Sequence, residues 1–312
     1  MFDLAELQQA RALVGQFFSP TPAYAWPLLA QRTGATIWVK HENHLPVGAF
    51  KLRGGLTYCA ALTQAGGVAG LVSATRGNHG QSLAYAGSRF GLPVTIFVPR
   101  GNSPGKNAAM RALGAELIEH GRDFDEAREQ AGLFAAERGL HMVPSFDPAL
   151  VRGVATYAAE FFEAAGPLDT VYVPIGMGSG ICGVMRTRDL LGLDTRIVGV
   201  VAEGAPAVAL SVQAGRVVTT AQAETFADGL ACRVPHPLAL EAIRAGADRI
   251  VMVSDHAIAQ AIEVLWNDTH NLAEGAGAAA LAAVLQERPQ GRIGIVLSGG
   301  NIDLPLFRSH VV

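Results

Sequence analysis

Charged residues and cysteines are both scarce in this chain. Asp, Glu, Lys and Arg make up 16% of the 312 residues, against 50% hydrophobic residues, which excludes a disordered chain and is typical of a compact globular enzyme. The net charge of -3 offers no basic excess to neutralise phosphates, so we expect no nucleic-acid partner. The three cysteines are odd in number and form no CxxC pair, which favours a reducing compartment, the cytoplasm.

Long apolar runs and metal-binding clusters are also missing. The longest uncharged run near the middle, residues 171–185, contains Pro174 and four glycines and is too short to span a bilayer, so we expect no membrane association. Asp3 and Glu6 stand where a signal peptide would carry basic residues. The nine histidines form no HxxxH-type or Cys/His cluster, and we therefore predict no metal site.

Strand-like and helix-like segments alternate along most of the chain. Apolar strand-like runs are expected at residues 36–40, 70–73, 94–99, 115–119, 141–143, 170–175, 196–202, 249–253 and 293–297. Helices are expected at 4–14, from about residues 51, 79, 104 and 123, and at 148–165, 180–191, 205–214, 236–245, 257–267 and 275–287. Strands separated by helices need crossover connections, so the pattern predicts an α/β fold with mainly parallel sheets and helices on both faces.

The length of 312 residues favours two lobes over a single core. No change in composition marks a linker, so the lobes are expected to share crossovers. The less regular segment 215–235 is the best candidate for a long loop near a site.

One lysine sits among apolar residues just after a turn. Lys51 is flanked by Phe50 and Leu52, and it follows Pro46 and Gly48. Burial among such groups lowers the pKa of a lysine and leaves its amine able to attack a carbonyl. The other interpretation is a lysine with a buried stem and an ammonium group in water. Taken alone, this stretch favours the second interpretation, and three further stretches reverse that.

Polar residues gather where a strand meets a helix at residues 73–82, Ser-Ala-Thr-Arg-Gly-Asn-His-Gly-Gln-Ser. This geometry would present free backbone N–H groups, the Asn78 amide and the His79 imidazole at a helix N-terminus, where a carboxylate or phosphate is stabilised. Helix capping would explain Asn78 alone. The polar cluster exceeds what a cap needs and therefore indicates a binding site.

A glycine-rich turn follows another strand at residues 174–183, and such a turn lets backbone amides approach an anion closely. It contains Gly178-x-Gly180-x-x-Gly183, and Glu203 ends the following strand, so a dinucleotide site and a monophosphate site both remain open.

The last strong strand ends at Ser298 in a Ser-Gly-Gly turn. A hydroxyl at the C-terminal end of an α/β strand is placed to contact a ligand.

Together these four motifs resemble one family over about residues 20–301, the fold-type II pyridoxal-phosphate-dependent threonine/serine dehydratases and serine racemases. Ala49–Gly54 is similar to the family's Ser-Phe-Lys-x-Arg-Gly, which implies that Lys51 is the Schiff-base lysine. Gly77–Gln81 matches the loop that holds the substrate carboxylate. Gly176–Gly180 corresponds to the tetraglycine phosphate loop, with Met177 and Ser179 in place of two glycines, and Ser298 falls where the family puts a hydroxyl against the pyridine nitrogen.

The resemblance implies a fold, a cofactor and a reaction. It implies the tryptophan synthase β-like fold, with a large domain of residues 1–45 plus 144–312, a small domain of residues 46–143, and pyridoxal 5'-phosphate between them. It implies β-elimination of a small β-hydroxy amino acid, such as threonine or serine, to a 2-oxo acid and ammonia, in a homodimer. The catalytic residues would be Lys51 and Ser298. The cofactor would contact Phe50, Lys51, Asn78, Gly176, Met177, Gly178, Ser179, Gly180, Glu274 and Ser298, and the substrate would contact Thr75, Arg76, Gly77, Asn78 and His79.

Some positions depart from the family pattern. Arg76 stands where the racemase has a serine that acts as a second base, and an arginine stays protonated, so racemisation is not expected. Arg76 could bind a second carboxylate, as in 3-hydroxyaspartate, or could pair with an acid on the surface. Ala209 stands where the family's cation site has an aspartate six residues after Glu203, so that site should be weak or absent. Glu274 resembles a glutamate near the cofactor ring, with a plain helix N-terminal acid as the other interpretation.

Alternatives stay open on the sequence alone. Within the same cofactor class these are a 3-hydroxyaspartate or phenylserine dehydratase, a β-replacement synthase and an amino-acid racemase. A catalytically silent binding or regulatory protein that keeps the fold is a further alternative, which the retention of Lys51 and Ser298 disfavours. A dinucleotide-dependent oxidoreductase would account for the glycine turn but would leave Lys51, Asn78 and Ser298 unexplained.

Overall fold

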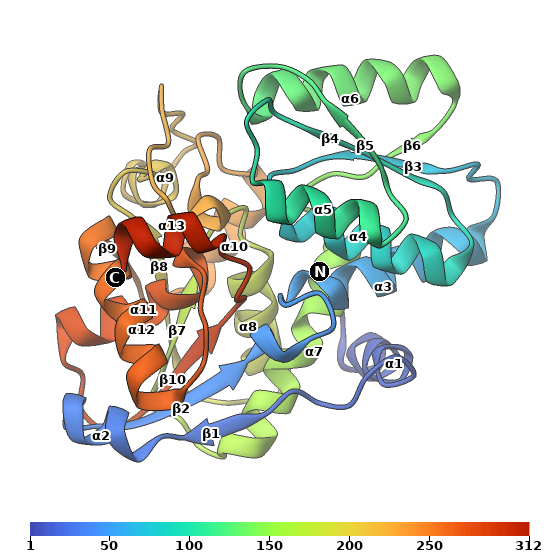
Figure 1. Cartoon of the computed structure of the whole chain (residues 1–312). Helices are drawn as coiled ribbons and strands as arrows, with labels where there is room; N and C mark the ends of the chain where they lie inside the picture. Colours follow the sequence, from blue (N-terminus) through green and yellow to red (C-terminus); the bar gives the residue numbers. More distant parts are fainter. Residues whose placement is uncertain (312) are drawn as a thin grey trace.

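Two sheets organise the chain, and each is the centre of an α/β lobe (Figure 1). The structure is a computed structural model and describes residues 1–311. The larger sheet has the strand order β1-β2-β10-β7-β8-β9 and the smaller sheet has the order β5-β4-β3-β6. All neighbouring strands are parallel except β1 and β2, which confirms the predicted α/β fold with mainly parallel sheets.

Apart from β1, which has no predicted counterpart, the strand bounds lie within two residues of the predicted runs. The six-stranded sheet consists of β1 (Ala23–Ala25), β2 (Thr36–His41), β7 (Thr170–Pro174), β8 (Arg196–Ala202), β9 (Arg249–Val253) and β10 (Arg292–Leu297). The four-stranded sheet consists of β3 (Leu71–Ala74), β4 (Val94–Val98), β5 (Glu116–Glu119) and β6 (His141–Met142). Most residues of the central strands are buried, as expected for parallel strands that are covered by helices on both faces.

The helices follow the expected alternation. The first seven are α1 (Leu4–Val14), α2 (Pro27–Thr33), α3 (Lys51–Ala65), α4 (Asn78–Phe90), α5 (Pro104–Ala112), α6 (Phe124–Arg138) and α7 (Pro148–Ala165). The others are α8 (Ser179–Leu190), α9 (Ala207–Ala214), α10 (Pro237–Gly246), α11 (Asp255–Thr269), α12 (Gly275–Glu287) and α13 (Leu304–His310), with the 3-10 turns η1 (Glu42–His44) and η2 (Asp228–Leu230). The elements β1, α2, η1 and α13 are short and were not predicted.

Local sequence explains several helix starts. Asp3 caps α1 in a capping box, because its Oδ1 accepts from the Glu6 N–H at 2.8 Å and the Glu6 carboxylate accepts from the Asp3 N–H at 2.9 Å. Helix α12 is rich in alanine and is largely buried. A Cβ at Gly277 would meet the Gly299 carbonyl oxygen at 2.2 Å, so only glycine allows α12 to approach the turn after β10 this closely.

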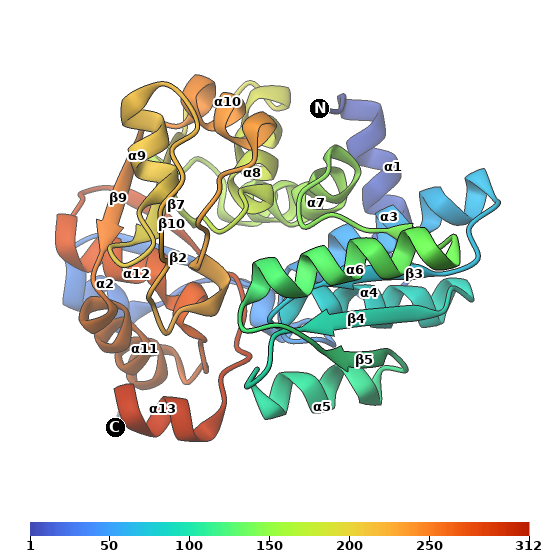
Figure 2. The ribbon, with the colours of Figure 1, turned by 90° about the horizontal axis from the view of Figure 1, so that it is seen from above.

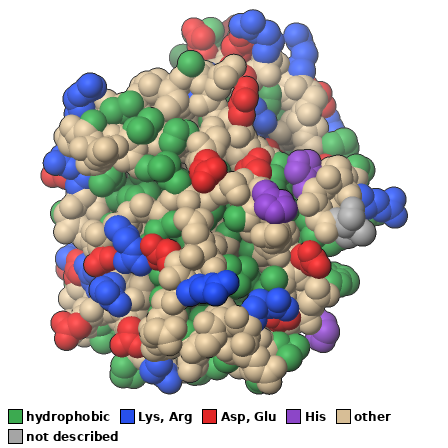
Figure 3. Space-filling view, turned by 90° about the vertical axis from the view of Figure 1, so that its left-hand side faces the viewer, with side chains coloured by type: hydrophobic (Ala, Val, Ile, Leu, Met, Phe, Trp, Pro, Cys, Tyr) green, Lys and Arg blue, Asp and Glu red, His purple; other side chains and the backbone are tan. Residues whose placement is uncertain are grey.

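The two lobes lie side by side when the molecule is seen from above (Figure 2). Helix α7 belongs to the large lobe and packs against α3 as well as α8, so it connects the lobes. The face of the large lobe shown in Figure 3 carries basic and acidic side chains interspersed with hydrophobic ones. Among residues 1–311, no helix combines the length and the apolar composition that crossing a bilayer would require.

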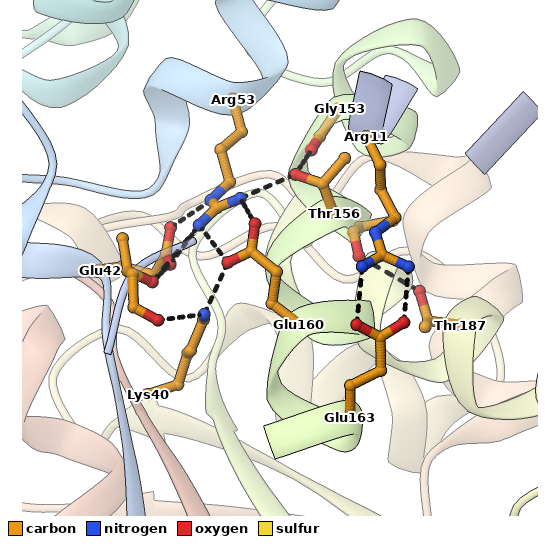
Figure 4. Close-up of polar contacts among 11 residues, drawn as sticks. Arg11, Lys40, Glu42, Arg53, Gly153, Thr156, Glu160, Glu163 and Thr187 are labelled. Atoms are coloured by element: carbon orange, nitrogen blue, oxygen red, sulfur yellow. Dashed lines mark hydrogen bonds and ion pairs between the residues drawn. The ribbon is translucent and has the colours of Figure 1, made fainter. Parts of the chain in front are cut away.

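A buried network of ion pairs fixes the start of α3 (Figure 4). Arg53 Nε donates to Glu42 Oε2 at 2.7 Å, and Arg53 Nη1 donates to Glu160 Oε1 at 2.6 Å. Lys40 Nζ completes the network with a 2.6 Å contact to Glu160 Oε2. Each charge has a partner, which a buried charge requires. Because Arg53 lies two residues after Lys51, the network holds the beginning of α3 against β2, η1 and α7.

Candidate active site

Two cavities meet at Lys51 between the lobes. The inner cavity lies against the glycine turn and is lined by Phe50, Lys51, Asn78, Pro174, Gly176 to Gly180, Gly229, Leu230, Glu274, Ala276 and Ser298. The outer cavity is lined by Lys51, Ala74 to His79, Lys106, Phe124, Ser145, Gly176, Met177, Asp228, Gly229, Ala231 and Cys232. Every residue that the sequence analysis placed in the site lines one of these two cavities. The structure therefore brings the four motifs together, while the role of each residue stays a prediction.

Lys51 is the first residue of α3, and its environment suits a reactive amine. Its Nζ lies 5.0 Å from the centroid of the Phe50 ring. Burial lowers the pKa of Lys51 to about 8, although the nearby charge of Glu274 acts in the opposite direction. The Lys51 carbonyl oxygen accepts a 2.7 Å hydrogen bond from Ser82 Oγ in α4, which fixes the backbone at this position. Lys51 is therefore held in place and is partly neutral near pH 8.

The Ser298 turn is attached directly to the lysine segment. The Phe50 N–H donates to the Ser298 carbonyl oxygen at 3.0 Å, and Ala49 and Gly299 form an isolated antiparallel bridge. Ser298 is buried at the C-terminal end of β10. These backbone contacts place its hydroxyl in the same cavity as Lys51 and the glycine turn.

The glycine turn presents a helix N-terminus to the inner cavity. Gly178 has a left-handed φ of 98°, and a Cβ at Gly176 would meet the Gly229 carbonyl oxygen at 2.1 Å, so both positions require glycine. Helix α8 begins at Ser179, and its first N–H groups have no partner within the helix. Backbone N–H groups and the helix dipole together favour an anion such as a phosphate group.

The dinucleotide interpretation of the same turn finds no support in the geometry. Gly183 packs against Ala155 of α7, where a Cβ would lie 3.2 Å from the Ala155 Cα, so its role is helix packing. Glu203 is exposed at the end of β8 and lies outside the linings of both cavities. The acid that would bind a ribose is therefore not at the site.

A chain of polar contacts crosses the cleft between the lobes. Asn301 Nδ2 donates to Asn78 Oδ1 at 2.9 Å, and Asn78 Nδ2 donates to Glu274 Oε1 at 2.5 Å. Lys106 Nζ lies 3.6 Å from Glu274 Oε2 and 3.0 Å from Asp228 Oδ2. Asn78 and Lys106 belong to the small lobe, and the other three residues belong to the large lobe. The contacts thus alternate between the lobes.

Electrostatics explain why this series of polar contacts between the lobes is stable. Burial raises the pKa of Glu274, whereas the charge of Lys106 and the hydrogen bond from Asn78 lower it, and the net shift is upward. Burial alone would lower the pKa of Lys106, but the charges of Glu274 and Asp228 raise it above its usual value. Lys106 therefore stays an ammonium group and compensates the two carboxylates. Sequence analysis missed Lys106, Asp228 and Asn301, although Asp228 lies in the segment 215–235 that was expected near a site.

His79 and Arg76 differ in burial. Burial, with a contribution from the charge of Lys51, lowers the pKa of His79 to about 3, so its imidazole is neutral. Its Nε2 is buried and has no hydrogen-bond partner among residues 1–311, and His79 lines the outer cavity. Arg76 is exposed where the outer cavity opens into a neighbouring cavity.

These residues fit the cofactor that the resemblance implies. Pyridoxal 5'-phosphate needs an amine for its aldehyde, N–H groups for its phosphate and a partner for its ring nitrogen. Lys51, the N-terminus of α8 and Ser298 offer these three functions within the lining of one cavity. The unpaired Nε2 of His79 offers a further hydrogen bond to a bound group.

Comparisons with known proteins agree with this geometry. The family model described as pyridoxal-phosphate dependent enzyme matches residues 14–299. The chain is 34% identical over 310 residues to an L-threonine ammonia-lyase of Thermotoga maritima, covering 98% of this chain and 77% of that protein. It is 32% identical to an L-threo-3-hydroxyaspartate ammonia-lyase of a Pseudomonas species, with 97% and 96% covered. The solved structure of maize serine racemase superposes with a TM-score of 0.93 at 27% identity, with 98% of this chain and 96% of that one covered.

Proposed function

The chain belongs to the pyridoxal-phosphate-dependent enzymes of the threonine and serine dehydratase group, and we propose that the residues around Lys51 carry its reaction. That reaction is the β-elimination of a hydroxy amino acid to a 2-oxo acid and ammonia, and the cofactor is pyridoxal 5'-phosphate. The family, the cofactor and the reaction predicted from the motifs are thus confirmed. The observation that carries the assignment to these residues is that all predicted site residues line two cavities that meet at Lys51.

Lys51 acts as the base in this proposal. When bound, pyridoxal 5'-phosphate supplies an electron sink for the charge that develops at the substrate Cα. Lys51 takes the Cα proton, and a pKa of about 8 leaves part of its amine neutral near the pH of the cell. The Ser298 hydroxyl would hold the ring nitrogen, and the N–H groups at the start of α8 would hold the phosphate.

The start of α4 holds the substrate carboxylate in this proposal. Thr75 Oγ accepts a 3.0 Å hydrogen bond from the Gly77 N–H, which fixes the loop. The N–H groups of Asn78 and His79 belong to the first turn of α4 and have no partner within the helix, so they are available to a carboxylate. The neutral imidazole of His79 adds a hydrogen bond without adding a charge.

One chemical experiment tests the central assignment. The chain contains three lysines, Lys40, Lys51 and Lys106, and none of them is exposed. Borohydride reduction of the holoenzyme fixes the cofactor to the amine that carries it, and peptide mass mapping then locates the modified lysine. We expect the pyridoxyl group on Lys51, together with ammonia release from threonine or serine. Modification of Lys40 or Lys106 would contradict the proposal.

We propose that the enzyme is a cytoplasmic homodimer. In support, the three cysteines are free and buried, as expected for a protein of a reducing compartment. Tyr24, Leu28 and Trp266 are large apolar side chains that the large lobe exposes, and a second subunit would remove such groups from water. Light scattering of the purified enzyme tests the dimer, and a monomer at micromolar concentration would overturn it.

We also propose the domain bounds expected from the resemblance, 46–143 for the small domain and 1–45 plus 144–312 for the large domain. All strands of the four-stranded sheet fall between residues 71 and 142, inside the first range. Hydrogen exchange should show fast-exchanging hinge segments near residues 45 and 144, and uniform protection across both positions would contradict these bounds.

A further inference from the structure

The outer cavity is lined by one arginine that no acid among residues 1–311 neutralises. Lys106 is paired with Asp228 and Glu274, and Lys51 is the proposed attachment point of the cofactor. Arg76 lines the same cavity and forms no ion pair or hydrogen bond with any of residues 1–311. Arg76 is therefore the cation of this cavity that is available to bind a substrate group.

The neighbouring arginines show that pairing is the rule here. A third cavity, which we call the vestibule, adjoins the outer cavity and shares Arg76 with it. Arg128 and Arg233 also line the vestibule, and both contact Asp125, each at 3.2 Å. Arg233 lies in addition 3.7 Å from Asp123. Among these three arginines, only Arg76 has no acid partner within residues 1–311.

The position of Arg76 in the chain decides what it can reach. It directly precedes Gly77, the first residue of the proposed carboxylate loop, and shares the outer-cavity lining with Asn78 and His79. A substrate held by its α-carboxylate at the start of α4 and by its amino group near Lys51 leaves its β-substituent in the rest of this cavity. Lys106 and Asp228 also line this cavity but are paired with each other, so Arg76 is the unpaired charged group that such a β-substituent would meet.

From these contacts we propose that Arg76 determines substrate specificity by binding a second carboxylate, so that the preferred substrate is 3-hydroxyaspartate. This inference rests on the proposed function of the site. The guanidinium group offers a planar fork of donors that matches a carboxylate in two hydrogen bonds. Arg76 is exposed, so it keeps its hydration when threonine binds and gains a partner only with a dicarboxylate.

The reaction of this substrate balances without any further reactant. The substrate loses the Cα proton and its β-hydroxyl as water, and one water is then consumed when the C–N bond is hydrolysed. 3-Hydroxyaspartate thus gives oxaloacetate and ammonia, with no net oxidation or reduction. The second carboxylate keeps its charge throughout, so its contact with Arg76 persists in each step.

The test compares two substrates in four proteins. Ammonia release from threo-3-hydroxyaspartate and from threonine is measured with the wild type, Arg76→Gln, Arg76→Lys and Arg128→Gln. Arg76→Gln should lower kcat/KM for 3-hydroxyaspartate about 10- to 100-fold more than it lowers kcat/KM for threonine. Arg76→Lys should recover part of the loss. Arg128→Gln removes one positive charge from the vestibule at a paired arginine and should leave the ratio of the two kcat/KM values unchanged.

A binding measurement separates recognition from turnover. Aspartate and 2-aminobutyrate have no β-hydroxyl to eliminate and serve as competitive inhibitors of threonine turnover. Arg76→Gln should raise the inhibition constant of aspartate at least about 10-fold more than it raises that of 2-aminobutyrate.

The outcomes distinguish this inference from the function on which it rests. Equal losses on both substrates in Arg76→Gln, or an unchanged preference, would overturn the role of Arg76 while threonine turnover keeps the lyase assignment intact. A holoenzyme that releases ammonia from no hydroxy amino acid would overturn the assignment of the site and the inference with it.

Discussion

Asn78 and Glu274 join the two lobes through a 2.5 Å hydrogen bond from the side-chain amide to Oε1. Asn78 is the first residue of α4, and Glu274 is the residue that precedes α12. The bond therefore ties the proposed carboxylate loop of the small lobe to the large lobe. Glu274 is buried, and burial raises its pKa. A charge introduced at position 78 would therefore change the ionisation of Glu274, because the two side chains are in direct contact.

Asn78→Asp should disrupt the site more than Asn78→Ala does. The aspartate would place a second carboxylate against Glu274, and two close carboxylates cannot both stay ionised. We expect cofactor affinity to fall at least about 10-fold at pH 8 and to recover partly at lower pH, where the pair takes up a proton. An absorbance titration with pyridoxal 5'-phosphate measures this. Asn267→Asp, at an exposed position of α11, is the matched control and should have no effect.

The lowered pKa of Lys51 predicts how cofactor attachment depends on pH. The neutral amine is the form that attacks an aldehyde, and the Lys51 pKa is about 8 instead of the usual 10.5. When apoenzyme is mixed with pyridoxal 5'-phosphate, the rate of attachment should rise as pH passes through about 8 and level off above it. Stopped-flow absorbance follows the reaction. A rate that still rises tenfold per pH unit at pH 9.5 would contradict the lowered pKa.

Lys106→Met should destabilise the protein by about 3 kcal/mol, the lower end of the range for breaking a buried ion pair. The substitution leaves the Glu274 and Asp228 carboxylates without their shared cation. Urea unfolding of the holoenzyme measures the free energy of unfolding. Adding Asp228→Asn to Lys106→Met should recover part of the loss, because one of the two uncompensated charges is removed.

An exposed pair provides the control for this change. Arg128 and Asp125 form an i,i+3 pair on α6 with both side chains partly exposed to water. Arg128→Met should therefore cost about 0–0.5 kcal/mol. Similar losses for Lys106→Met and Arg128→Met would show that burial adds nothing to the Lys106 pair.

Gly176→Ala should weaken cofactor binding. The added Cβ would lie 2.1 Å from the Gly229 carbonyl oxygen, so the turn that presents the α8 N–H groups must shift. We expect at least about a 10-fold loss of affinity for pyridoxal 5'-phosphate in equilibrium dialysis. Gly132→Ala in α6 is the control, because its Cβ would meet no atom within 4 Å and a helix interior favours alanine by about 0.5–1 kcal/mol. Equal cofactor affinity in the two variants would contradict the prediction.

Most of the fold could be predicted because local sequence and tertiary structure agree. The strand runs of the parallel sheets are mostly apolar, and a helix such as α7 is bounded by the capping residue Asp147 and by Gly166, which are visible in the sequence. The short edge strand β1 and the seven-residue helices α2 and α13 escaped prediction, because such short segments show too few repeats of a period. Their positions depend on the sheet and on the core against which they lie.

The site could be predicted where a motif is contiguous in the chain. Lys51, Asn78 and Ser298 each lie in a short run that has a recognisable pattern. Lys106 gives no such pattern, because its function depends on Asp228, which lies 122 residues further along the chain. Only the folded chain brings an ammonium group of α5 between two carboxylates of the large lobe.

Because no lysine is exposed, cleavage by a lysine-specific endoprotease would report on local opening of the folded protein. Its three cleavage sites, at Lys40, Lys51 and Lys106, all lie where the lobes meet or where α3 begins, so the closed molecule should resist the enzyme. Cleavage after Lys106 requires the lobes to separate, and cleavage after Lys40 requires the buried network around Arg53 to come apart. The order in which the fragments accumulate would then show which of the two opens first.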